Sequence, residues 1–191
     1  VQDYALGAGV TTATSIGGSR QGAATEDSAV QASGTLTVTG AAISSDNVLQ
    51  PPTSLAGTFG NFTLNVNTGA WTYALDHSKA VTQALTAGQK VTDKLTVASK
   101  DGKASAEIVI EITGVNDSVA ITGTRTGSVT EDSATQNTAS GTLTVSDVDT
   151  GEAVFNAPAS ASLAGTFGNF TFNANTGAWT YTLDNSKPAT Q

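Results

Sequence analysis

Residues 55–83 read LAGTFGNFTLNVNTGAWTYALDHSKAVTQ, and residues 163–191 read LAGTFGNFTFNANTGAWTYTLDNSKPATQ. At this offset of 108 residues, 23 of the 29 positions are identical. Both copies extend upstream, where Thr25–Ser28 recurs as Thr130–Ser133. A period of this length is too long for a solenoid repeat, which spans about 20–50 residues, and it suits a whole small domain. We therefore expect two related domains in tandem.

The repeat also sets the expected domain bounds. One domain is predicted over residues 10–114 and a second over residues 115–191, with residues 1–9 forming an N-terminal arm or the end of a preceding unit. Gln191 aligns with Gln83, so the second copy is expected to lack its last strands. Near-identical copies favour a function in which the repeats extend the protein or multiply a binding site, and not the catalysis of one unique reaction.

Apolar and polar side chains alternate along most of the chain, which predicts half-buried strands. Residues 62–66 and 71–75 form one predicted hairpin, and residues 95–112 form a second with an Asp-Gly turn. Aromatic residues recur at matching positions of the two copies, so we expect them in the core. Only residues 78–85 are compatible with a helix. This pattern predicts an all-β fold of tandem immunoglobulin-like, antiparallel β-sandwiches, the second of them incomplete.

Composition excludes several functions. The formal charge of −8 and the pI near 4.3 argue against a nucleic-acid partner, which requires a basic surface. The chain has no Cys and no Met, which excludes disulfides, thiolate zinc sites and thiol catalysis. No run is apolar enough for membrane insertion. An acidic chain rich in Thr, Ser and Gly suits an extracellular module.

Four motifs carry a resemblance to a known family. They are Gly-x-Val-x-Glu-Asp at Gly127–Asp132, the run Gly141–Ala153, the repeated Trp-Thr-Tyr-x-Leu-Asp, and Thr-Gly-Val-Asn-Asp at Thr113–Asp117. The chain resembles VCBS repeats, the bacterial cadherin-like modules of large secreted RTX-type adhesins. The resemblance implies an immunoglobulin-like sandwich, a secreted or cell-surface location and, by analogy with cadherin-like modules, Ca²⁺ at domain junctions.

Several carboxylates are expected near the junction of the two domains, where the resemblance implies Ca²⁺. Ca²⁺ takes six to eight oxygen ligands, and Asp147 and Asp149 lie two residues apart before Gly151. In an immunoglobulin-like topology, the acids of the first domain should approach the junction from the other side. The predicted ligands are Glu26, Asp27, Asp93, Asn116, Asp117, Asp147 and Asp149. The alternative is that Asp and Asn near strand ends only serve turns, as we expect of Asp101.

The first copy lacks the paired acids: Gly40 and Ala42 stand opposite Asp147 and Asp149. We therefore expect the start of the first domain to bind Ca²⁺ poorly.

The sequence predicts a structural role without enzymatic activity. Its sole His, His77, is replaced by Asn185 in the second copy, which argues against a general base. The favoured function is an extender, or stalk, of a bacterial adhesin that is stiffened by Ca²⁺ and has neighbouring repeats as partners. The alternative is a self-assembling filament subunit, in which a strand from another copy completes the second domain. A sugar-binding module would need exposed Trp71 and Trp179.

Overall fold

The computed structural model describes residues 13–191, and the chain divides into two compact units, Val1–Asn116 (unit 1) and Asp117–Gln191 (unit 2). The predicted arm, residues 1–9, and the first residues of the predicted first domain lie outside the described residues. The division falls two residues beyond the expected one, which was placed after Gly114.

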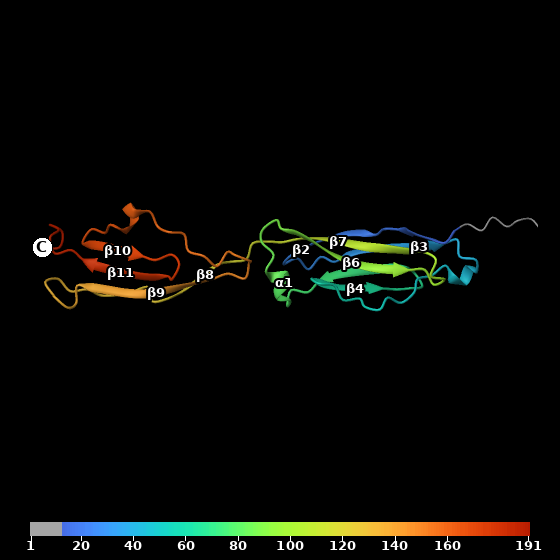
Figure 1. Ribbon diagram of the computed structural model, residues 1–191, viewed down its shortest axis with the longest axis horizontal. Coiled ribbons are helices and arrows are strands. Elements are labelled where there is room, and N and C mark those ends of the chain that lie inside the picture. Colours follow the sequence, from blue (N-terminus) through green and yellow to red (C-terminus); the bar gives the residue numbers. More distant parts are fainter. Residues whose placement is uncertain (1–12) are drawn as a thin grey trace, which may run out of the picture. The chain divides into compact units, whose positions relative to one another are not determined.

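Unit 1 is a sandwich of two sheets (Figure 1). Its strands are β1 (Ser15–Gly18), β2 (Gln21–Thr25), β3 (Ala32–Thr39), β4 (Gly60–Leu64), β5 (Ala70–Leu75), β6 (Lys90–Ala98) and β7 (Ser105–Thr113). One sheet has the order β1-β3-β5-β4 and the other the order β2-β7-β6. The pairs are antiparallel apart from β2 and β7, which run parallel from Gln21 opposite Val109 to Thr25 opposite Thr113. Two short helical turns, η1 (Ser44–Asp46) and α1 (Ala80–Gln83), lie in the connections.

The core of unit 1 follows from the alternation of its strands. Trp71 and Tyr73 on β5 and Ile108, Ile110 and Ile112 on β7 are each at most 1% exposed. Side chains two residues apart share one face of a strand, so these residues lie between the two sheets. The predicted core position of the first-copy aromatics is thereby confirmed. Burying side chains of this size contributes about 1.5–3 kcal/mol each.

A glycine closes the turn between β4 and β5. Gly69 has a φ of 71°, and a Cβ built on it would lie 2.0 Å from the carbonyl oxygen of Leu36. This approach lets the Leu36 amide donate to the Gly69 carbonyl at 2.9 Å. Gly177 repeats both features against Leu143. The repeated Asn-Thr-Gly sequence thus joins the hairpin to the neighbouring strand β3 in unit 1 and to its counterpart in unit 2.

Unit 2 contains one sheet among the described residues. Its elements are β8 (Ala120–Gly123), β9 (Thr138–Ser146), η2 (Ser160–Leu163), β10 (Gly168–Phe172) and β11 (Ala178–Leu183). The order β10-β11-β9-β8 repeats the order β4-β5-β3-β1 of unit 1, and each pair is antiparallel. The all-β, antiparallel class is confirmed, and the described residues of unit 2 form no counterpart of the β2-β7-β6 sheet.

The structure departs from the predicted elements in three ways. The short strands β1, β2 and β8 carry too few apolar residues for a periodic signal, and sequence reasoning did not resolve them. The parallel β2–β7 ladder was also not predicted, because it joins segments about 90 residues apart. The predicted helix over residues 78–85 shortens to α1, whose four residues lie within it.

Candidate functional site

Three acids of unit 2 are joined through hydrogen bonds at the end of β9. Asp149 is 2% exposed, and its Oδ2 accepts a hydrogen bond of 3.0 Å from the amide of Asp117. The amide of Asp149 in turn donates to Oδ1 of Asp147 at 3.0 Å. The structure therefore brings together three of the seven predicted ligands, all near the start of unit 2.

One carboxylate oxygen of Asp149 is a candidate ligand for a cation. This oxygen, Oδ1, is buried and accepts no hydrogen bond from residues 13–191. A buried carboxylate oxygen without a donor is costly, and a bound cation would offset that cost. The oxygen-only donors suit Ca²⁺. However, within the described part of the chain no group of three or more Asp, Glu or His side chains is arranged to hold a metal ion. A cation here would therefore take further ligands from carbonyl groups or water.

Glu26 acts as a clamp within unit 1. It follows β2, is 2% exposed, and accepts a hydrogen bond of 2.9 Å on Oε2 from the amide of Val115. Its own amide donates to the carbonyl oxygen of Thr113 at 2.9 Å. Glu26 thus fastens the chain leaving β7 to the end of β2. The adjacent Asp27 is exposed with a φ of 58°, and Asn116 is exposed after the clamped amide.

Asp93 has structural partners that sequence reasoning missed. It lies on β6 and is 3% exposed. Its carboxylate accepts hydrogen bonds from the amides of Thr58, Phe59 and Gly60 at 2.8, 2.9 and 3.2 Å. The hydroxyl of Tyr73 donates to the same carboxylate at 2.5 Å. Four protein donors thus occupy the two oxygens of Asp93, so this carboxylate has a structural role in holding the loop Gly57–Gly60.

The Asp93 site also has a distinct electrostatic effect. Burial, together with the hydrogen bond to Asp93 and its charge, raises the pKa of Tyr73 far above its usual value. The Tyr73 hydroxyl therefore stays protonated and remains a donor to Asp93. A signal for this arrangement was present in the sequence, since Thr-Phe-Gly recurs in both copies within the longest stretch of identity.

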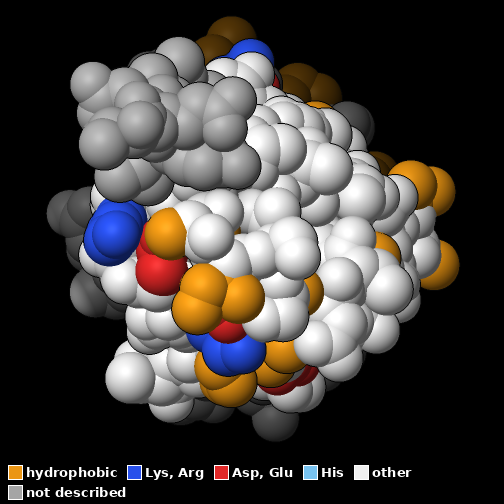
Figure 2. Space-filling model, turned by 90° about the vertical axis from the view of Figure 1, so that its right-hand side faces the viewer, with side chains coloured by type: hydrophobic (Ala, Val, Ile, Leu, Met, Phe, Trp, Pro, Cys, Tyr) orange, Lys and Arg blue, Asp and Glu red, His pale blue; other side chains and the backbone are white. Residues whose placement is uncertain are grey.

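The end of unit 1 that carries η1 has mostly uncharged surface. Figure 2 faces this end and shows scattered Lys, Arg, Asp and Glu side chains among larger uncharged areas. Asp46 of η1 pairs with Lys100 at 2.8 Å. Gly40 and Ala42 stand at the positions of the paired acids of unit 2. The expectation of poor Ca²⁺ binding at the start of the first domain remains a prediction.

Asp101 organises the turn between β6 and β7. Hydrogen bonds from the hydroxyls of Ser99 and Thr14, both of 2.6 Å, and from the amide of Lys103 lower its pKa to about 2. This role in a turn agrees with the expectation from the sequence.

The lowered pKa of Asp101 predicts that part of the stability of unit 1 is lost in acid. A carboxyl whose folded pKa lies below its unfolded value stabilises the fold above the unfolded value, near 3.8, and this contribution is lost as the pH falls toward 2. We expect Asp101→Asn to lower the urea midpoint of unit 1 at pH 6 and to have almost no effect at pH 2. Urea unfolding of both proteins between pH 2 and pH 6 checks this. A difference that stays constant with pH would show that the Asp101 charge is not involved.

The two tryptophans differ in exposure. Trp71 is buried and donates from Nε1 to the Ser19 carbonyl at 2.9 Å, so it offers no surface for a sugar. Trp179 is partly exposed and donates to the Thr124 carbonyl at 2.7 Å. The same sequence motif therefore lies in different surroundings in the two units.

Comparisons with known proteins place the chain in no family. No family model matches it, and no curated protein matches it. Among solved structures, it is similar to the crystal structure of the protocadherin GammaB4 extracellular domain, with 17% sequence identity and a TM-score of 0.41. That match covers 86% of this chain and 26% of the protocadherin chain, so this chain spans about a quarter of its length. Within residues 13–191, no helix has the length and apolar character needed to cross a membrane.

Proposed function

We propose that this chain is a non-enzymatic extender segment of an extracellular bacterial adhesin, with neighbouring repeats of the same type as its partners. The observation that carries the proposal is the repetition of one four-stranded sheet, strand for strand, in the two units. Repeating a domain adds length without adding a new site. The resemblance to VCBS repeats supports the extracellular location. A role of such an adhesin in biofilms is part of the same proposal.

The same proposal assigns Ca²⁺ to unit 2. Asp149, Asp147 and Asp117 would hold the ion, and the partnerless Asp149 Oδ1 supports this choice. Bound Ca²⁺ would supply positive charge to acids that otherwise repel one another. Because Asp117 directly follows Asn116, the ion would also restrain the linker.

A calcium titration tests this assignment. With a dissociation constant of about 10⁻⁴–10⁻³ M, typical of extracellular modules, 10 mM Ca²⁺ should stabilise unit 2 by about 1.4–2.7 kcal/mol. A domain of this size should then melt several degrees higher. We expect Asp149→Asn to abolish the shift. Calorimetry of both proteins in Ca²⁺ and in chelator is the measurement.

The matched control is Glu107→Gln, which removes an exposed acid paired only with Lys94 at 3.3 Å. It should keep the full calcium response, because exposed ion pairs contribute little. Equal melting in Ca²⁺ and in chelator, or an undiminished response in Asp149→Asn, would contradict the Ca²⁺ assignment.

A further inference from the structure

The start of unit 1 is held by a side-chain hydrogen bond to a distant turn. Thr14 precedes β1, and its hydroxyl donates to Oδ2 of Asp101 at 2.6 Å. Asp101 lies in the turn between β6 and β7, 87 residues away along the chain. We call this contact the latch. It joins the first described residues of unit 1 to the last hairpin of the same unit.

The turn that carries the acceptor of the latch is fixed by its own hydrogen bonds. The hydroxyl of Ser99, a fully buried residue, donates to Oδ1 of Asp101 at 2.6 Å. The amide of Lys103 donates to the same oxygen at 3.1 Å. The amide of Lys100 donates to the carbonyl oxygen of Val48 at 2.9 Å, which attaches the turn to the connection that follows β3. The Asp101 carboxylate therefore has a defined position.

The latch lies at the place where unit 2 carries its paired acids. The Thr14 hydroxyl is 3.5 Å from the carbonyl oxygen of Gly40, and Gly40 stands opposite Asp147 in the repeat. Farther along the same connection, Asp46 pairs with the ammonium group of Lys100 at 2.8 Å. Two carboxylates near the start of unit 1, those of Asp46 and Asp101, thus receive their donors from the protein itself.

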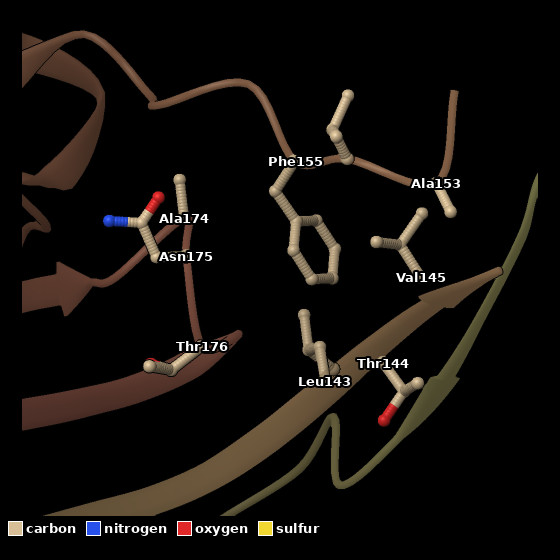
Figure 3. A pocket seen from close by; sticks show the side chains of 9 residues that line it. Leu143, Thr144, Val145, Ala153, Phe155, Ala174, Asn175 and Thr176 are labelled. Atoms are coloured by element: carbon tan, nitrogen blue, oxygen red, sulfur yellow. The ribbon is translucent and has the colours of Figure 1, made fainter. Parts of the chain in front are cut away.

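The start of unit 2 is organised differently. Asp149 Oδ1 is buried and accepts no hydrogen bond from the described residues. The position of Thr14 is occupied by Val119, which has no hydroxyl to donate. Beyond the acids, the connection packs on its own strand, and Figure 3 shows the Phe155 ring pointing toward Leu143 of β9. A cation would therefore supply to unit 2 what protein donors supply to unit 1.

From these contacts we propose that the start of unit 1 is fastened without Ca²⁺, by the Thr14–Asp101 latch, whereas the start of unit 2 depends on the ion. The part that concerns unit 2 rests on the proposed function, and the latch rests on the contacts of unit 1. A carboxylate that already has its donors gains little from a cation, because the cation would first have to displace them. A stalk that contains both kinds of start would keep part of its stiffness when Ca²⁺ is scarce.

The experiment measures amide hydrogen exchange in the full chain by NMR, in Ca²⁺ and in chelator. The amides of β1 report on the start of unit 1, and those of β8 report on the start of unit 2. We expect exchange in β8 to be slower in Ca²⁺ and exchange in β1 to be equal in the two buffers. Thr14→Val should accelerate exchange in β1 severalfold, up to about tenfold, because a hydrogen bond to a charged group is lost. Thr14→Ser keeps the hydroxyl and should keep the slow exchange.

Thr96→Val is the matched control. It also replaces a threonine by valine, but on the exposed side of β6, within the hairpin that carries Asp101, and it should leave exchange in β1 unchanged. If Thr14→Val behaved like Thr96→Val, the latch would be overturned. Exchange in β1 that slows when Ca²⁺ is added would overturn the independence of this start from the ion. If β8 shows no response to Ca²⁺, the Ca²⁺ assignment of unit 2 fails, and the exchange in β1 of Thr14→Val still tests the latch.

Discussion

Asp93→Ala is expected to destabilise unit 1 by about 3–5 kcal/mol, a large part of the 5–15 kcal/mol typical of a small domain. The substitution removes a buried carboxylate and leaves the amides of Thr58 and Phe59 and the Tyr73 hydroxyl without an acceptor. Each unsatisfied donor costs about 1–3 kcal/mol. Urea unfolding, followed by the NMR signal of the Trp71 indole, measures the loss in unit 1 alone.

Two further variants test whether the loss of stability in Asp93→Ala comes from the buried carboxylate. Tyr73→Phe removes one of the four donors and should cost only about 1 kcal/mol. Glu107→Gln removes an exposed carboxylate of unit 1 and should change stability by less than about 0.5 kcal/mol. If Asp93→Ala were no more damaging than Glu107→Gln, the carboxylate would not hold the loop Gly57–Gly60 in solution.

Phe62→Ala and Phe170→Ala should differ strongly although they change the same position of the repeat. Phe62 is 3% exposed and packs against Tyr73 with ring centroids 4.7 Å apart, so its removal leaves a cavity and should cost about 3–4 kcal/mol. Phe170 is 44% exposed, so its removal should cost less than about 1 kcal/mol. The indole signals of Trp71 and Trp179 report the unfolding of each unit in one urea titration.

The repeat supplies the control for this pair, because Phe170 packs on Tyr181 at 4.6 Å as Phe62 packs on Tyr73. The difference in cost therefore measures the cover that the β6–β7 sheet provides. Equal costs would mean that the face of unit 2 is covered in solution.

Strand content was predictable from the sequence because alternation is a local property. Residues 62–66 and 71–75 carry the periodic signal themselves, and β4 and β5 formed close to these positions. The parallel partner of β2 was not predictable. The five residues Gln21–Thr25 are too few to show an alternation of apolar and polar side chains, and their partner strand lies about 90 residues away in the sequence. Pairing of that kind depends on the whole sandwich.

For the acidic residues, too, one part was predictable from the sequence and another was not. Their presence near strand ends was visible in the sequence, and Asp147 and Asp149 do follow a strand directly. What each carboxylate contacts depends on packing. Asp93 was predicted to face a cation, yet its alternation with Val91 and Leu95 on β6 directs it inward, where loop amides meet it.

The parallel ladder between β2 and β7 has a mechanical consequence. Parallel strands start at the same edge, so a force that stretches the chain pulls the beginning of β2 and the end of β7 toward opposite ends of the ladder. The ladder is then loaded in shear, and its five residue pairs, Gln21 to Thr25 with Val109 to Thr113, resist together instead of opening one after another. The clamp of Glu26 on Val115 adds a bond at the end where tension leaves the unit. Unit 1 is thereby suited to bear load along the chain.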